Sequence, residues 1–184
     1  MTLISRTTGY AAIGAAMLLG TAVLGEELAI PHIEIENPQA GYPTGWLGDS
    51  MAMDGNTLIV GANDSDRERM YAVGIARVYV SDGVGGWSLQ GELAADDPFE
   101  FAYFGASVAI SGDTAVVGAN LDSRLGSCHG ATYVFTRTDG VWSQEAKLVA
   151  ADASENDFFG DTVAISGNTI MVGVSSDDDN GTSS

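Results

Sequence analysis

The strongest constraint on the fold is an internal repeat with a nearly fixed period. Three stretches of similar sequence open at Gly48, Gly105 and Gly160. In each stretch two further glycines follow at the same spacing: Gly55, Gly112 and Gly167, then Gly61, Gly118 and Gly173. The clearest copy spans 104–120, and it recurs over 159–173 and, more loosely, over 47–63. A fixed period of this kind is the signature of an array of stacked equivalent units. We therefore expect repeated supersecondary units and not one irregular core.

The second half of the unit recurs as well. Three segments of the first copy match segments of the second at one common separation in the sequence, which we call the common shift. They are 76–80 (Ala-Arg-Val-Tyr-Val) with 131–135 (Ala-Thr-Tyr-Val-Phe), 87–88 (Trp-Ser) with 142–143, and 92–93 (Glu-Leu) with 147–148 (Lys-Leu). The step from Gly48 to Gly105 is longer than this shift by two positions. This alignment predicts that the two extra residues fall in one place, the loop that joins Gly61 to Ala76 in one copy and Gly118 to Ala131 in the next.

Each unit contains four short runs typical of β-strands, which in the clearest copy cover residues 107–110, 115–118, 131–136 and 142–148. The first pair flanks Ser-Gly-Asp-Thr, a two-residue hairpin signal with glycine first, as a type II′ turn requires, and the second pair flanks Asp139-Gly140. The first two runs are apolar throughout, which predicts strands covered on both faces. The outer two alternate, with Tyr133 and Phe135 on one face. No window has a sustained period of 3.6, so helices are not expected after the N-terminal segment.

Four antiparallel strands per unit, with buried inner strands, describe the blade of a β-propeller. Phe104-Gly105 followed by Gly118-Ala119-Asn120 resembles the FG-GAP repeat of integrin α-subunit propellers, and most nearly its bacterial secreted type. The resemblance covers about residues 41–184, in copies at about 41–98, 99–153 and, in part, 154–184. The motif positions are Gly48, Trp87, Phe104, Gly105, Gly118, Trp142, Phe159, Gly160 and Gly173. The resemblance implies an all-β fold, an incomplete β-propeller of about two and a half four-stranded antiparallel blades.

The third copy has no counterpart of the outer two runs before Ser184. Propellers close with typically 4–8 blades, so further blades or other chains are expected to complete the ring. Three explanations stay open: a truncated gene product, which we favour, a module completed by other chains, and an open stack that is stable alone.

The N-terminal segment predicts export. Arg6 precedes an uncharged run from Gly9 to Gly25 that is rich in Ala, Leu and Met, and Glu26 and Glu27 end it. A basic start, an apolar stretch and small residues before an acidic chain are typical of a secretory signal peptide. We expect a signal peptide over residues 1–25, cleavage after Gly25, an N-terminal segment over 26–40, and a secreted or cell-surface protein without a membrane span. The alternative is an uncleaved membrane anchor, but the apolar run has close to the minimum length that can span a bilayer.

The charge balance excludes one class of partner. The chain has 25 Asp and Glu residues against 7 Lys and Arg residues, for a formal net charge of −18. Neutralising nucleic-acid phosphates requires a basic face, so no nucleic acid is expected as a partner. The acidity instead favours a solvated, self-repelling surface.

The sequence contains no catalytic constellation. Gly48-Asp49-Ser50-Met51 mimics the start of a serine-hydrolase motif, but the repeats align Ser50 with ordinary strand residues. His129 adjoins the single cysteine, Cys128, and two such neighbours cannot complete a tetrahedral zinc site. An exposed Cys128 could pair with another chain, although we favour an incidental residue. We predict no enzyme activity, no catalytic residue and no cofactor-binding residue.

Acidic residues recur in one inter-strand loop of successive units: Asp64, Asp66, Asp122, Asp177 and Asp179. Carboxylates on a loop suit Ca²⁺, but Asp also stabilises ordinary turns, and we favour solvated turns over weak calcium sites. Integrin-type repeats often carry a calcium loop between the first two strands of a blade. Here that span is only Ser111-Gly112-Asp113-Thr114, which is too tight for six to eight oxygen ligands, so no calcium site transfers from the family.

The resemblance implies extracellular recognition or adhesion. We therefore expect a non-enzymatic repeat module that binds an extracellular protein or glycan through its variable loops. The alternative is a scaffold fragment of a larger secreted propeller enzyme, such as a polysaccharide lyase or hydrolase, whose active residues are absent from this sequence.

Overall fold

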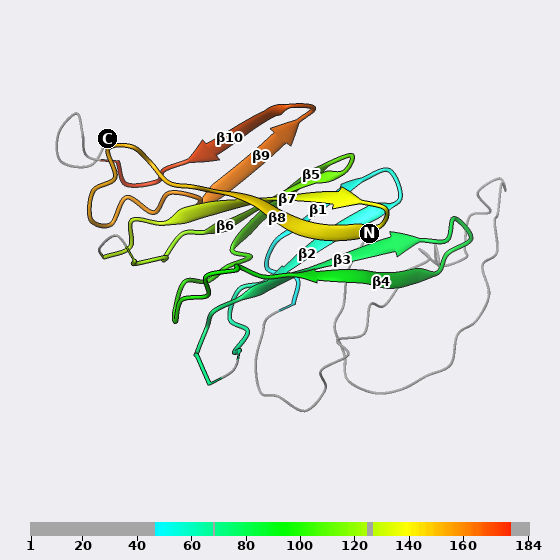
Figure 1. Ribbon diagram of the computed structural model, residues 1–184, viewed down its shortest axis with the longest axis horizontal. Helices are drawn as coiled ribbons and strands as arrows, with labels where there is room; N and C mark the ends of the chain where they lie inside the picture. The colour runs from blue at the N-terminus through cyan, green and yellow to red at the C-terminus, as the bar shows by residue number, and fades with distance from the viewer. Residues whose placement is uncertain (1–46, 68, 125–126, 178–184) are drawn as a thin grey trace, which may run out of the picture.

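The computed structural model describes residues 47–67, 69–124 and 127–177, so the signal peptide expected over 1–25 and the segment 26–40 lie outside the described residues. The described chain folds into ten β-strands (Figure 1). They are β1 (Met51–Asp54), β2 (Thr57–Ala62), β3 (Ile75–Ser81), β4 (Trp87–Leu93), β5 (Ser107–Ser111), β6 (Thr114–Ala119), β7 (Ala131–Thr138), β8 (Val141–Leu148), β9 (Thr162–Ser166) and β10 (Thr169–Gly173). Across these residues there is no helix long and apolar enough to cross a membrane.

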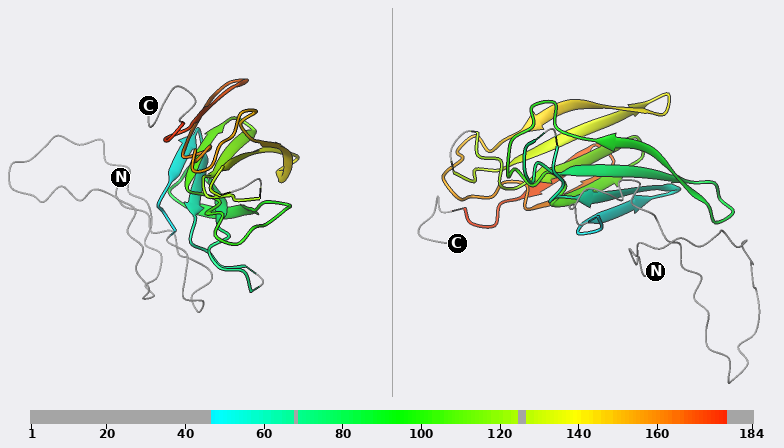
Figure 2. Two further views of the ribbon diagram at one scale, coloured as in Figure 1. Left: turned by 90° about the vertical axis from the view of Figure 1, so that its left-hand side faces the viewer. Right: turned by 90° about the horizontal axis from the view of Figure 1, so that it is seen from below.

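The strands form three antiparallel sheets, which we call the first, second and third blades. The first has the order β1-β2-β3-β4, the second β5-β6-β7-β8, and the third contains β9 and β10. The leading strands lie side by side, β1 against β5 and β5 against β9. Seen along the strands, the blades are stacked one against the next (Figure 2). The all-β prediction of about two and a half antiparallel blades is therefore confirmed for the described residues.

The tight turns have the predicted geometry. The β5–β6 hairpin turns on Gly112 and Asp113, and of these two only the glycine has a positive φ, +58°. A positive φ at the first central position alone fits the type II′ turn, which glycine adopts without a steric penalty. In the β7–β8 hairpin both Asp139 and Gly140 have positive φ, 51° and 80°, as a type I′ turn requires.

The strand pairing corrects the alignment of the repeats at the third strand. Val60 of β2 lies opposite Arg77, and its equivalent Val117 of β6 lies opposite Tyr133. Arg77 therefore corresponds to Tyr133 and not to Thr132, as the common shift of the two copies predicted. The two extra residues of the first unit are split, one in the β2–β3 loop and one in the β3–β4 hairpin. This one-residue shift reverses the predicted face of every side chain in the third strand, because neighbouring residues of a strand point to opposite faces.

Burial follows the position of each strand in the stack. β2, β5 and β6 are buried along almost their whole length, as predicted. The predicted alternation of the third strand is wrong for β7, whose first half is buried on both faces, because the link before β9 packs close to Thr132. β3 is buried in the same way, so among the outer strands of the first two blades only β8 alternates over most of its length.

The terminal blades expose part of their apolar surface. Met51 and Met53 of β1 and Met171 of β10 are exposed, whereas Val116, the equivalent of Met171, is fully buried by the third blade. The first blade nevertheless buries part of this apolar surface. Its Leu58, Val60 and Tyr79 form a second buried cluster, with Leu47 and Trp87 packed against it.

The main core lies between the first and second blades. Phe104, from the link between them, is buried and contacts Tyr133 and Phe135 of β7, with ring centroids 5.2 Å and 5.9 Å away. Ile59 and Val78 complete the face of the first blade in the same cluster. The phenylalanine of the Phe-Gly motif is therefore the apolar residue that joins one blade to the next.

The glycine of the same motif supplies a polar contact between blades. Ser50 Oγ donates a hydrogen bond to the carbonyl oxygen of Gly105 at 2.7 Å, and Ser107 Oγ donates to that of Gly160 at 2.7 Å. A Cβ on Gly118 would collide with that Gly160 oxygen. Ser50 thus has a structural role at the interface between the first and second blades.

Candidate recognition site at the long-loop end

The two ends of the strands differ in their connections. The hairpin end carries short turns, including 55–56, 112–113, 139–140 and 167–168. The long-loop end carries the connections 63–74, 94–106, 120–130 and 149–161, which lie together on the left of Figure 1. Long connections held by a rigid scaffold are where binding residues concentrate, so this end is the candidate site.

Backbone hydrogen bonds between neighbouring blades hold these loops. Phe101 N donates to Tyr71 O at 2.9 Å, and Phe104 N donates to Val73 O at 2.9 Å. The second interface repeats the arrangement, with Asn156 N donating to Ser127 O and Phe159 N donating to His129 O. The loops are therefore fixed in space by the same bonding pattern at both interfaces.

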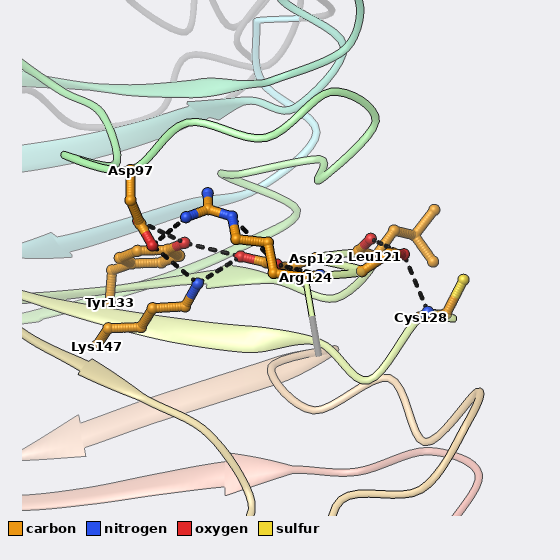
Figure 3. A network of polar contacts seen from close by, with 8 residues as sticks. Asp97, Leu121, Asp122, Arg124, Cys128, Tyr133 and Lys147 are labelled. Atoms are coloured by element: carbon orange, nitrogen blue, oxygen red, sulfur yellow. Dashed lines mark hydrogen bonds and ion pairs between the residues drawn. The ribbon is translucent and has the colours of Figure 1, made fainter. Parts of the chain in front are cut away.

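A polar network of Asp97, Asp122, Arg124, Tyr133 and Lys147, in which only Asp122 and Tyr133 are buried, lies at this end (Figure 3). Lys147 Nζ donates to Asp122 Oδ2 at 2.8 Å and to Asp97 Oδ2 at 3.2 Å. The Tyr133 hydroxyl donates to Asp122 Oδ2 at 2.9 Å, and the Arg124 guanidinium pairs with Asp97. Since Asp97 follows the first blade and the others belong to the second, the network ties the two blades together.

The network shifts the pKa of two of its members, Asp122 and Tyr133, in opposite directions. Burial alone would raise the pKa of Asp122, but the hydrogen bonds from Lys147, from the Arg124 backbone N–H and from Tyr133 outweigh it and hold the pKa below its ordinary value. Burial and, next, the Asp122 carboxylate raise the pKa of Tyr133 far above its ordinary value. Two carboxylates face two cations, so the charges balance and the arrangement serves to position the loops.

A groove lies beside this network, between the outer strands of the first two blades. Its volume is about 630 Å³, and its lining includes Arg67, Glu92, Asp96, Phe135, Trp142 and Gln144. Trp142, one of the motif positions, donates from Nε1 to Gln90 Oε1 of β4 at 2.9 Å, and the Arg137 guanidinium lies 5.0 Å from its ring centroid. The motif tryptophan therefore fixes one wall of the groove.

The acidic residues proposed as weak calcium ligands do not converge. Asp64 and Asp66 lie in the β2–β3 loop, Asp122 in the β6–β7 loop and Asp177 after β10, while Asp179 lies outside the described residues. Asp66 Oδ1 accepts the Ala72 N–H at 2.9 Å, and Asp122 Oδ2 is bonded to Lys147. Within residues 47–67, 69–124 and 127–177, no three or more His, Cys, Asp or Glu side chains are grouped to hold a metal ion.

Cys128 and His129 lie in the β6–β7 loop, where both take part in the interblade contact. Cys128 is half-buried as a free thiol, and its N–H donates to Ser123 Oγ at 3.0 Å. His129 is buried, and its carbonyl accepts the Phe159 N–H. The backbone of this pair therefore has a structural role in the loop.

Sequence reasoning missed the polar network, apart from Asp122. One signal could have found it: equivalent positions of the two complete units hold Glu92 and Lys147, a reversal of charge within an otherwise similar strand. A charge reversal between repeats indicates that the residues around the position differ in charge too. Here they are Arg77 beside Glu92 and Asp122 beside Lys147.

The comparison with known families agrees with this architecture. The family model of the FG-GAP repeat matches residues 87–135 and 142–184. The first match runs from β4 to β7 and the second starts in β8, so the family's unit is the blade shifted by one strand. No curated protein is detectably similar in sequence. The matched residues are half of the chain, and their motif glycines and phenylalanines form the blade interfaces: the chain belongs to the FG-GAP repeat family.

Proposed function

We propose that this protein is a non-enzymatic recognition module that binds an extracellular protein or glycan through its long-loop end. The observation that carries the proposal is the difference between the two ends of the strands. Short turns close one end, whereas the other presents four long connections, held by interblade hydrogen bonds and by a charge-balanced network. A rigid scaffold that presents varied loops on one side is suited to binding.

The test blocks each end separately. In a Cys128→Ser background, Glu155→Cys places a thiol at the exposed long-loop end and Val84→Cys places one at the exposed β3–β4 turn of the hairpin end. Each thiol is coupled to a polyethylene glycol chain, and binding to a panel of extracellular proteins and glycans is measured. We expect at least about a tenfold loss from the label at 155 and none from the label at 84. Equal losses, or a loss only at 84, contradict the proposal.

The proposed function requires that the protein leaves the cytoplasm, and we propose that the N-terminal segment directs this export. The motivating pattern is the basic start, the apolar run and the acidic residues from Glu26 onward. N-terminal sequencing of the exported protein is expected to begin at Glu26, within a few residues. Arg6→Glu, which removes the positive charge before the run, is expected to reduce export. A mature protein that retains Met1 would instead support the anchor.

A further inference from the structure

Two aromatic side chains are exposed and stacked at the long-loop end. Tyr71, in the β2–β3 loop, is 62% exposed, and Phe101, in the β4–β5 link, is 53% exposed. Their rings are nearly parallel, at 19°, with centroids 6.5 Å apart. Single exposed apolar residues are normal on a protein surface. Two rings from separate connections that stack on each other are a small aromatic surface open to solvent.

The backbone keeps this surface in place at the expense of strain. Phe101 N donates to Tyr71 O at 2.9 Å, and Tyr71 N donates to Glu100 Oε1 at 3.2 Å. Phe101 has a φ of 60°, in the left-handed region that is unfavourable for a bulky residue. The same left-handed conformation recurs in both links, at Tyr103 (φ 56°) and at Phe158 (φ 59°), so it is part of the backbone of the repeat.

The second interface shows that the fold does not need these rings. There the equivalent hydrogen bond runs from Asn156 N to Ser127 O at 2.8 Å, and Asn156 has the equivalent φ of 69°. Asparagine is among the residues that adopt this region most readily. The same backbone position thus accepts a small polar pair, and the aromatic pair of the first interface calls for a reason other than folding.

The groups beside the pair indicate the ligand. Carboxyl groups outnumber guanidinium groups near the rings in the sequence: Asp66, Glu68, Asp96, Asp97 and Glu100 lie within five residues of Tyr71 or Phe101, against Arg67 and Arg69. This excess disfavours a polyanion, and the mixture of hydrogen-bond acceptors and donors suits a ligand rich in hydroxyls. Arg67 also lines the groove between the blades, which gives a longer ligand a continuation from the rings.

We propose that Tyr71 and Phe101 form a platform that stacks against the pyranose ring of a neutral glycan, while the flanking Asp, Glu and Arg side chains bind its hydroxyl groups. The apolar C–H face of such a ring matches the face of an aromatic side chain, and a few polar groups fix its orientation. This inference rests on the proposed recognition function, to which it adds a site and a ligand class.

The test exchanges the pair for its counterpart at the second interface, Tyr71→Ser with Phe101→Asn. The probes are cello-, manno-, xylo- and chito-oligosaccharides, with polygalacturonate and chitosan as charged comparisons. We expect the unaltered protein to bind neutral members and the double variant to lose about tenfold or more in affinity. Its melting temperature should stay equal or rise, because Asn relieves the strain at position 101.

Each other outcome contradicts a different part of the proposal. Equal glycan binding by both proteins would show that Tyr71 and Phe101 do not bind the glycan, and it would leave the proposed recognition function unaffected. If only a charged polysaccharide or a protein binds, and the label at position 155 blocks that binding, the neutral glycan is the wrong ligand but the recognition function stays supported. If the label at Glu155 blocks nothing, the recognition function fails as well.

Discussion

Gly74→Ala is expected to lower the free energy of unfolding by about 4 kcal/mol. Gly74 has a φ of +81°, and a Cβ placed there would lie 2.6 Å from the amide nitrogen and 2.8 Å from the carbonyl carbon of Phe104. The backbone of Phe104 cannot retreat, because its N–H is bonded to Val73 and its ring is packed in the main core. The substitution therefore separates the first blade from the second, and urea unfolding followed by tryptophan fluorescence measures the loss.

Gly112→Ala is the matched control. Gly112 has a positive φ of 58°, but a Cβ there would meet no atom within 4 Å. Only the backbone strain remains, and we expect a loss of about 1 kcal/mol. If both variants lose the same amount, the close approach of the chain to Phe104 does not contribute and the explanation for Gly74 is wrong.

Asp122→Ala is expected to lower the free energy of unfolding by about 3–5 kcal/mol. The substitution removes the 4%-exposed carboxylate that Lys147 and the Tyr133 hydroxyl share, and leaves them only the longer, more exposed bonds to Asp97. The control is Asp113→Ala, which breaks the pair with Arg137 at the hairpin end, where the Asp113 side chain is 71% exposed. An exposed ion pair contributes about 0–1 kcal/mol. Similar losses in the two variants would show that the network contributes no more than a surface pair.

The pH dependence of stability gives the same residue a second readout. The pKa of Asp122 in the folded protein lies below its ordinary value of 3.8. A group with a depressed folded pKa stabilises the protein above the unfolded value, and this contribution is lost as the pH falls through the folded value. We expect the unaltered protein to lose stability below about pH 4 more steeply than Asp122→Asn does. Parallel curves for the two proteins would contradict the assignment.

Much of the fold could be predicted because the repeats multiply each local signal. The hairpin at Ser111-Gly112-Asp113-Thr114 occurs three times in similar form, and the apolar runs on its two sides predict strands, which are buried where neighbouring blades cover them. The register of the third strand was harder to predict. Arg77 and Tyr133 are chemically unlike, so composition offered no reason to align them, and only the hydrogen-bonded pairing shows that they are equivalent.

The candidate site could not be predicted in the same way. The stacking of Tyr71 on Phe101 depends on two connections that are distant in the sequence and on a backbone bond between blades. Their counterparts, Ser127 and Asn156, give no hint of an aromatic surface. Repetition reveals what the units share, whereas the proposed recognition surface consists of positions at which they differ.

The bonds between Ser50 and Gly105 and between Ser107 and Gly160 also set the order in which the chain can assemble during synthesis. Each joins residues in consecutive units, 55 and 53 positions apart. The first blade therefore gains its covering face only after the ribosome has released most of the second, at a translation rate of about 5–20 residues per second. Until then Ile59 and Val78 face solvent, so the nascent chain passes through a brief interval, seconds long, in which a chaperone has an apolar sheet to hold.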